Sequence, residues 1–528
     1  MRQSRVLVAS LGASLILSVL YLAAPRMGSD LSAQVARAWF FAEHGPAMVD
    51  LRWYGGVHQF GYSLVSQPVM ALLGVRVTGA LALLLAGGAF AALLVRTRVP
   101  RPLPGSLLGV ICIAGNLVSG RVTYALGVAF GLLALLALTV PGDTGRRRLL
   151  RYGGAAAGAL LASATSPVAG LFTGLVAAAL LATRRFADGL FLGVAAAAPL
   201  TVTAGLFGDG GWMNISRSDA AQAIVASLLV AALVRYRPVR IGALLSAGGV
   251  LLAALVHTPV GLNATRLAVM FTLPVLAAAA RLPEPVDARL PAALRARAVG
   301  ATALVALLGA AWWWQPPVVT ADLRSIGDPT SDRAYFTPLL TELARHRLVG
   351  RVEIPPTRNY WEAAYLGDLP LARGWLRQAD IDRNPLFFET VPGAAGTGVP
   401  LTAQSYRRWL AENAVQFVAV PNADLSWVGR AEAELIDSGL PYLNLVWSHP
   451  RWRLYAVADP RPVVAEPATL VDHTAAALTF RTPQAGPVRV RVRHSPWLTV
   501  SGRADIAADG DWIVVTTPGP GTYRIRSS

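Results

Sequence analysis

The chain has 528 residues, of which 54% are hydrophobic and 15% are charged, and its mean hydropathy is +0.48. Apolar runs such as 77–95 and 155–181 are long enough to cross a hydrocarbon core of about 30 Å, which excludes a wholly soluble protein. The net charge of +17 does not indicate nucleic-acid binding, because the excess of arginine lies in 1–314 (25 Arg against 9 acidic residues) and not in 315–528 (22 against 21).

The apolar runs predict a polytopic α-helical membrane domain over residues 1–314. The first run is interpreted as an uncleaved helix and not as a cleaved signal peptide, because its apolar stretch is long and further spans follow. Counting each run once gives about eleven spans. They are predicted at 6–24, 77–96, 105–118, 121–140, 151–165, 166–183, 187–205, 218–234, 240–256, 264–280 and 298–314.

Arginine sets the predicted orientation of these spans in a plasma membrane. If the arginine-bearing ends face the cytoplasm, 18 arginines lie inside, the N-terminus is cytoplasmic and the C-terminal region is extracytoplasmic. The longest cytoplasmic loop is then Arg281–Arg297, which leaves no cytosolic domain to bind a soluble activated sugar. The apolar stretch Gly61–Gly74 is treated as an outer extension or re-entrant piece, since a full extra span would reverse every later loop.

Outer loop one, at 25–60, is rich in groups that bind polar ligands or carry out chemistry. It contains the acidic residues Asp30, Glu43 and Asp50, and the stretch DLRWYGGVHQFGYS with Trp53, Tyr54 and His58. The carboxylates are candidate general bases, and the aromatic and histidine side chains are candidate substrate-binding groups. Two alternatives stay open: Asp50 and Arg52 form a local ion pair that fixes the loop, and His58 is a structural hydrogen-bonding residue.

Three predicted outer turns each carry one arginine: Arg121, Arg217 and Arg266. Arginine is disfavoured on this side of a membrane, and its planar guanidinium matches phosphate oxygens in a bidentate manner. A phosphate of a lipid at the outer leaflet is therefore one explanation. The alternative is that each arginine extends to the headgroups or pairs with an aspartate such as Asp209 or Asp219. Polar residues of the same turns, Asn116 and Asn263, are further candidate substrate-binding groups.

The region beyond the last span divides into two predicted parts. Residues 315–462 alternate helical patterns with short strands, which indicates an extracytoplasmic α/β domain. Residues 463–528 contain strand patterns only, including the period-two run VRVRVR, and predict a β-sandwich-like domain with one buried and one wet face. Between the helical patterns, Arg358–Asn384 is dense in aromatic and polar residues, which suits either sugar rings or an amphipathic surface segment.

The sequence contains neither a metal-ligand spacing such as HExxH or CxxC nor a phosphate-binding GxxxxGK[ST] loop. No metal site and no cofactor are therefore predicted, although carboxylates at the membrane could recruit a divalent cation.

The segments NLVSGRVTYALGVAFG, ATSPVAGLF and TPVGLNATRL, at 116–131, 164–172 and 258–267, resemble those of GT-C superfamily glycosyltransferases that use polyprenyl-phosphate sugars. The layout of the whole chain is most similar to the actinobacterial branch that builds envelope arabinan and mannan, that is, arabinofuranosyl- and mannosyltransferases. Members often show paired acidic residues in loop one, whereas here Asp30 is followed by Leu31.

The resemblance implies a membrane glycosyltransferase that moves a sugar from a polyprenyl-phosphate donor to an envelope glycan or lipid acceptor outside the cell. Asp30 is then the leading candidate for the base that takes the acceptor proton, with Glu43 and Asp50 as alternatives. Arg121, Arg217 and Arg266 would hold the donor phosphate. A non-catalytic transporter or a lipid-linked-sugar binding or assembly protein is the alternative, although no inverted repeat favours transport.

Overall fold

The computed structural model describes residues 2–281, 292–394 and 396–528, and the chain divides into two compact units. The helical unit comprises Met1–Pro25, Ser63–Leu206 and Met213–Arg324. The mixed unit comprises Arg26–Tyr62, Phe207–Trp212 and Ser325–Ser528. Outer loop one thus belongs to the same unit as the C-terminal region, although most of the helical unit separates them in sequence.

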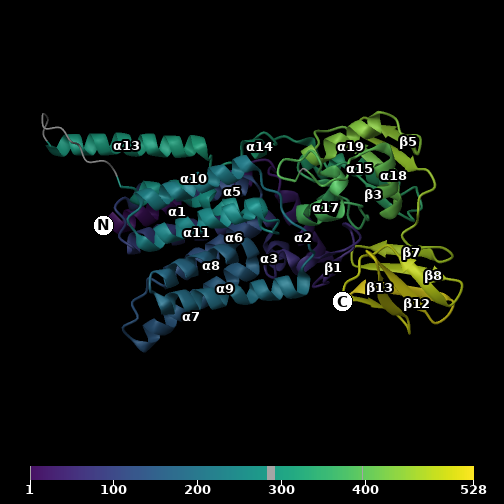
Figure 1. The fold of residues 1–528 in the computed structure, drawn as a ribbon, viewed down its shortest axis with the longest axis horizontal. Coiled ribbons are helices and arrows are strands. Elements are labelled where there is room, and N and C mark those ends of the chain that lie inside the picture. The colour runs from purple at the N-terminus through teal and green to yellow at the C-terminus, as the bar shows by residue number, and fades with distance from the viewer. Residues whose placement is uncertain (1, 282–291, 395) are drawn as a thin grey trace. The chain divides into compact units, whose positions relative to one another are not determined.

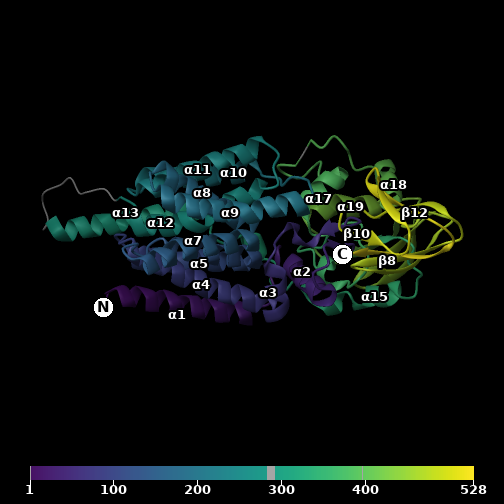
Figure 2. The ribbon, with the colours of Figure 1, turned by 90° about the horizontal axis from the view of Figure 1, so that it is seen from below.

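The helical unit is a bundle whose helices run alongside one another (Figures 1 and 2). Each of the eleven predicted spans overlaps one helix of the described residues, and the central pairs α4–α6, α5–α12 and α10–α11 pack together. Its elements are α1 (Arg2–Ala23), α3 (Ser66–Leu73), α4 (Val75–Arg96), α5 (Pro102–Val118), α6 (Val122–Ala137), α7 (Gly145–Thr165), α8 (Pro167–Ala182), α9 (Phe186–Phe207), α10 (Arg217–Leu233), α11 (Arg237–Leu255), η2 (Gly261–Thr265), α12 (Arg266–Ala279), α13 (Ala292–Trp314) and α14 (Thr320–Leu323).

Local signals explain where several of these helices begin. Ser166 accepts a hydrogen bond from the Ala169 amide at the start of α8, and Pro167 follows at the first helical position. Ser216 caps α10 in the same way through the Asp219 amide. By length and composition, five helices among the described residues can cross a membrane, so a multi-pass membrane protein is supported, and the count of eleven spans stays a prediction. Most of the predicted loop Arg281–Arg297 lies outside the described residues.

The stretch Gly61–Gly74 does not form a further span. It contains α3, an eight-residue helix of about 12 Å that ends where Gly74 adopts a φ of 85° and α4 begins. A helix of that length cannot cross a hydrocarbon core, which agrees with the predicted extension or re-entrant piece.

The mixed unit contains a four-stranded sheet of order β3-β4-β6-β5, in which β3 and β4 are parallel and the other pairs are antiparallel. Helices cover this sheet, and a core around Phe388, Tyr406 and Val418 lies between them. Its elements are α15 (Thr337–Leu343), β3 (Arg351–Glu353), α16 (Glu362–Tyr365), α17 (Arg377–Arg383), α18 (Ala403–Glu412), β4 (Val415–Pro421), α19 (Trp427–Asp437), β5 (Leu443–His449) and β6 (Trp452–Val457), with short 3-10 turns η3 (Pro329–Ser331), η4 (Arg333–Tyr335) and η5 (Pro385–Phe387).

Seven strands at the end of the chain form two antiparallel sheets of orders β10-β13-β8-β7 and β11-β12-β9 (Figure 1). Side chains of both sheets, among them Phe480, Val490 and Ile525, share one core, which is the arrangement of a β-sandwich. The predicted turn AADGDW joins β11 to β12, with Gly510 at a φ of 60°. The strands are β7 (Thr469–Thr474), β8 (Ala477–Thr482), β9 (Gly486–Val490), β10 (Leu498–Val500), β11 (Asp505–Asp509), β12 (Trp512–Thr517) and β13 (Gly521–Ser527).

Outer loop one is ordered within the mixed unit. It forms α2 (Leu31–His44), a two-stranded hairpin of β1 (Val49–Asp50) and β2 (Val57–His58), and the short turn η1 (Gln59–Gly61). Much of α2 is buried, including Leu31 and Phe40 at 1% exposure each, so loop one is part of the core of this unit and not a free covering loop.

Candidate functional site

Two of the three predicted phosphate-binding arginines meet at one tyrosine of the helical unit. The Arg266 guanidinium lies 5.3 Å from the centre of the Tyr124 ring, and both Arg121 and Arg266 interact electrostatically with the Tyr124 phenol. Arg217, in contrast, is exposed at the first residue of α10. The structure therefore brings Arg121 and Arg266 together and gives Arg217 a surface position.

Short turns hold these two arginines at helix starts. Arg121 precedes α6 in a turn closed by Asn116, whose side-chain nitrogen donates to the Arg121 carbonyl at 3.2 Å. Gly120, with a φ of 77°, makes this tight turn without strain. Arg266 is the first residue of α12 and directly follows η2, where Asn263 is 8% exposed. Asn116 and Asn263 thus shape the two turns that carry the arginines.

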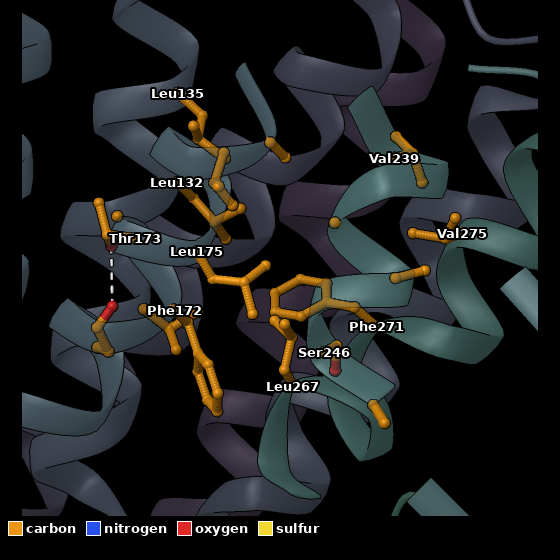
Figure 3. Close-up of a pocket in the computed structure, with 18 of the residues that line it drawn as sticks. Leu132, Leu135, Phe172, Thr173, Leu175, Val239, Ser246, Leu267, Phe271 and Val275 are labelled. Carbon is orange, nitrogen blue, oxygen red and sulfur yellow. Dashed lines mark hydrogen bonds between the residues drawn. The ribbon is translucent and has the colours of Figure 1, made fainter. Parts of the chain in front are cut away.

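An apolar cavity of about 290 Å³ lies beside this pair, inside the helical unit (Figure 3). The cavity is lined by side chains of six helices, α4, α6, α8, α10, α11 and α12, and Tyr124 and Leu267 belong to its wall. Its few polar groups are satisfied within the protein: the Thr173 hydroxyl donates to the Ala169 carbonyl at 2.8 Å, and Ser227 bonds Ser246 at 3.2 Å. The cavity therefore suits hydrocarbon.

The Tyr124 hydroxyl is the exception in this wall. It is buried, and no hydrogen-bond partner for it exists among the residues that the structure describes. A buried hydroxyl without a partner is costly, at about 1–3 kcal/mol. An acceptor oxygen placed beside Tyr124, Arg121 and Arg266 would satisfy it, so this end of the cavity is suited to a phosphate.

Asp30, the leading base candidate, occupies the N-cap position of α2 in the mixed unit and is 8% exposed. Its neighbour Ser29 lies within reach of the carboxylate, with Oγ 3.4 Å from Oδ1, and the Trp375 indole donates to the Ser29 carbonyl at 2.8 Å. Glu43, on the last turn of the same helix, is exposed. Neither carboxylate is therefore excluded as the base, but only Asp30 is buried and lies among fixed neighbours.

Asp50 has a structural partner that accounts for both of its oxygens. The Arg52 side chain donates to them at 2.7 Å through Nη2 and at 3.0 Å through Nε, and both residues are buried. Three aromatic rings surround the guanidinium, those of Trp39, Phe40 and Trp53. The structure thus contains the ion pair that the sequence offered as the alternative for Asp50, and the role of Asp50 as an alternative base stays a prediction.

Trp53 and Tyr54 also take structural positions, at 1% and 2% exposure. Gly374 packs directly against the Trp53 ring, where a Cβ would come within 2.4 Å, and the Tyr54 hydroxyl donates to the Gly374 carbonyl at 2.6 Å. Both rings are buried, and their substrate-binding role stays a prediction. Arg358–Asn384 follows the same pattern, since Trp361 and Tyr365 are buried and stack on each other.

His58 lies at a polar cavity, and no sequence pattern links it to the other residues there. Its Nδ1 is 3.2 Å from Asp209 Oδ1, and its Nε2 is 3.0 Å from Ser495 Oγ. Arg383 and Arg493 line the same cavity. Asp209 lies in a predicted outer turn, and Arg493 ends the period-two run that predicted a wet strand face. No pattern within either segment shows that they meet at His58.

No group of three or more His, Cys, Asp or Glu side chains that could hold a metal ion occurs within the described ranges 2–281, 292–394 and 396–528.

No family model matches the chain, and no curated protein matches it in sequence. Among solved structures, it is similar to the arabinofuranosyltransferase AftD from mycobacteria, with a TM-score of 0.46 and 16% identity over 91% of this chain and 41% of that chain. A mutant of AftD gives a TM-score of 0.46 and 12% identity, over 99% of this chain and 60% of that chain. ArnT from Cupriavidus metallidurans, in a crystal structure bound to undecaprenyl phosphate, gives a TM-score of 0.47 and 14% identity. The match covers 85% of this chain and 97% of that chain.

The chain thus spans less than two thirds of either AftD chain. These matches carry neither a donor nor an acceptor to this protein.

Proposed function

We propose that the chain is a membrane glycosyltransferase of the GT-C type that takes its sugar from a polyprenyl-phosphate donor. The observation that carries the proposal is the end of the apolar cavity, where the unpartnered Tyr124 hydroxyl lies with Arg121 and Arg266. The cavity receives part of the polyprenyl chain, and the two guanidinium groups with the phenol bind the phosphate. Arg217 is not needed for this site.

In this proposal, the lipid phosphate is also the leaving group of the reaction. Cations and a hydroxyl donor near its oxygens stabilise the negative charge that develops as the glycosidic bond breaks. A base must remove the proton of the acceptor hydroxyl, and we assign this role to Asp30, the first carboxylate after α1. The acceptor is an envelope glycan or lipid, and arabinofuranosyl and mannosyl phosphate lipids are the donors to test first.

The test measures sugar transfer from radiolabelled polyprenyl-phosphate donors in membranes that contain wild-type protein or Asp30→Asn. Since a general base contributes about 10²–10⁴ in rate, Asp30→Asn should lose transfer by a factor of that order and keep donor binding. Glu43→Gln is the matched control, because Glu43 is exposed on the same helix and should transfer at the wild-type rate. Donor binding without transfer by the wild-type protein would instead support a lipid-linked-sugar binding or assembly protein.

A further inference from the structure

A second cavity, of about 350 Å³, lies within the mixed unit and is unrelated to the apolar cavity described above. Five segments form it: the β1–β2 hairpin, residues 208–210, the end of α17, and the two loops around 493–495 and 510–511. Four of its side chains carry positive charge or can acquire it: Arg383, Arg493, His58 and His494.

Asp209 joins the segments on one side of this cavity. Its carboxylate accepts the His58 main-chain N–H at 3.0 Å, lies 3.2 Å from the His58 ring and 3.7 Å from the Arg383 guanidinium. Arg383 also donates to the Gly56 and Asp209 carbonyls, at 3.1 and 3.2 Å. One carboxylate thus serves both an imidazole and a guanidinium, which leaves the positive charge of Arg383 only partly balanced.

Arg493 lies on the other side, where the carboxylates of Asp511 and Asp382 act on it. Its Nε donates to the Tyr54 carbonyl at 3.1 Å, and its acidic neighbour Asp511 is 3.5 Å away and 75% exposed. Burial and the nearby Arg383 lower the pKa of Arg493 to about 10. Two guanidinium groups are therefore held close together in a partly desolvated cavity, an arrangement that a bound anion stabilises.

We propose that this cavity binds a phosphate monoester. Arg383 and Arg493 line the cavity from different segments, and each guanidinium has five N–H donors, more than the contacts named above use, which suits a tetrahedral oxyanion better than a planar carboxylate. His58 and Ser495, which bond each other at 3.0 Å, complete the polar wall. The cavity volume falls in the range of small-molecule sites, so the ligand is a phosphate ester with an organic group and not inorganic phosphate alone. Gly56, Gly210 and Gly510 in the wall allow that group to approach the main chain.

The phosphate can belong to a soluble sugar phosphate or to the headgroup of an anionic lipid. Isothermal titration calorimetry on the full chain in neutral-lipid nanodiscs distinguishes them, with glucose 1-phosphate and dihexanoyl phosphatidate as the two probes. Glucose and glucuronate are the neutral and carboxylate controls. Binding of either phosphate probe that depends on Arg493 supports the site and identifies the source.

The variants separate binding at this cavity from misfolding and from the donor site. Arg493→Gln should weaken binding about tenfold or more, the scale of a charge-assisted hydrogen bond. Asp511→Asn should strengthen it about two- to fivefold, because it removes the exposed carboxylate that competes for Arg493. A misfolded variant cannot produce that gain. Asp509→Asn is the matched control, since Asp509 pairs with Arg489 at 2.9 Å on the same sheet and outside the cavity.

Arg266→Gln should leave this binding unchanged, so the result is independent of the proposed glycosyl transfer. The proposal is overturned if neither phosphate probe binds in an Arg493-dependent manner, if Asp511→Asn fails to strengthen binding, or if glucuronate binds as tightly as glucose 1-phosphate.

Discussion

The Arg52 guanidinium donates to both oxygens of the Asp50 carboxylate, with Nη2–Oδ2 at 2.7 Å and Nε–Oδ1 at 3.0 Å. Arg52 is 2% exposed and Asp50 is 4% exposed. The same guanidinium donates to the Ala36 carbonyl at 3.1 Å and thereby ties the β1–β2 hairpin to α2. Loss of either charge leaves the other buried without a partner. The pair is thus a structural device at the centre of loop one.

Arg52→Ala should therefore destabilise the protein by about 3–5 kcal/mol, the cost of breaking a buried ion pair. Chemical unfolding of the purified protein, followed by tryptophan fluorescence, measures this change. Arg489→Ala removes one member of a half-exposed pair with Asp509 and should cost about 0–1 kcal/mol. Equal effects of the two substitutions would contradict the role given to Arg52.

Tyr124→Phe removes one hydroxyl and keeps the ring that Arg266 contacts. If this hydroxyl binds the donor phosphate, the substitution should weaken polyprenyl-phosphate binding about tenfold, and Arg266→Gln should weaken it by at least as much. Equilibrium binding of a labelled polyprenyl phosphate to the purified variants tests both. Tyr152→Phe is the control, because Tyr152 stacks on Phe191 in the same unit and does not line the cavity. An unchanged affinity in Tyr124→Phe and Arg266→Gln would remove the phosphate site.

Gly242→Leu should fill part of the apolar cavity. A Cβ at this position meets Ala179 and Leu175 at ordinary contact distances of 3.8 and 3.9 Å, and Gly242 lines the cavity. Competition for volume should then weaken binding of the polyprenyl donor while the thermal stability stays the same. Gly248→Leu on the same helix meets no atom within 4 Å and should bind as wild type does. Identical donor affinities for the two variants would show that the chain of the lipid lies elsewhere.

Glu362 predicts a pH dependence of stability in the mixed unit. Burial raises the pKa of Glu362 to about 7 from an ordinary 4.5, although the Thr357 hydroxyl donates to it at 2.5 Å. Since the folded-state pKa is the higher one, the stabilising contribution is fully present below pH 4.5 and is lost as the pH rises through about 7. The loss amounts to at most about 3 kcal/mol.

Urea unfolding at pH 5 and pH 8 should therefore show a smaller loss of stability for Glu362→Gln than for the wild-type protein. Burial lowers the pKa of His473 to about 4, which has the opposite effect below pH 6.5, but both proteins contain His473 and its contribution cancels in the comparison. The same pH dependence in both proteins would contradict the assignment to Glu362.

The arginine distribution predicts an extracytoplasmic C-terminal region. A cysteine placed after Ser528 should react with a membrane-impermeant maleimide in intact cells. The native Cys112 is buried in α5 and should not react, so the unmodified protein serves as the control. Labelling that appears only after permeabilisation would reverse the predicted topology and exclude an outer-face reaction for Asp30.

Sequence alone located the helices of the helical unit and several strands, but not α2 or the β1–β2 hairpin of loop one. Each apolar run of the membrane region corresponds to a helix, because helix formation in such runs depends on local hydrogen bonds and on apolar content within one segment. The strands of 463–528 likewise followed from alternation and from the turn at Gly510. The outer position of Arg121 and Arg266 stays a prediction from the arginine distribution, and their meeting at Tyr124 could not be inferred from sequence.

Only the tertiary structure decided which polar groups meet. Arg493 occupies the predicted wet face of its run, yet that face packs against the Tyr54 carbonyl, 439 residues away in sequence. Asp209 was one possible partner of the outer arginines, and in the structure it instead contacts His58 and Arg383. Periodicity determines which way a side chain points from its own strand or helix. What packs against that side depends on contacts between distant segments, on which the local pattern carries no information.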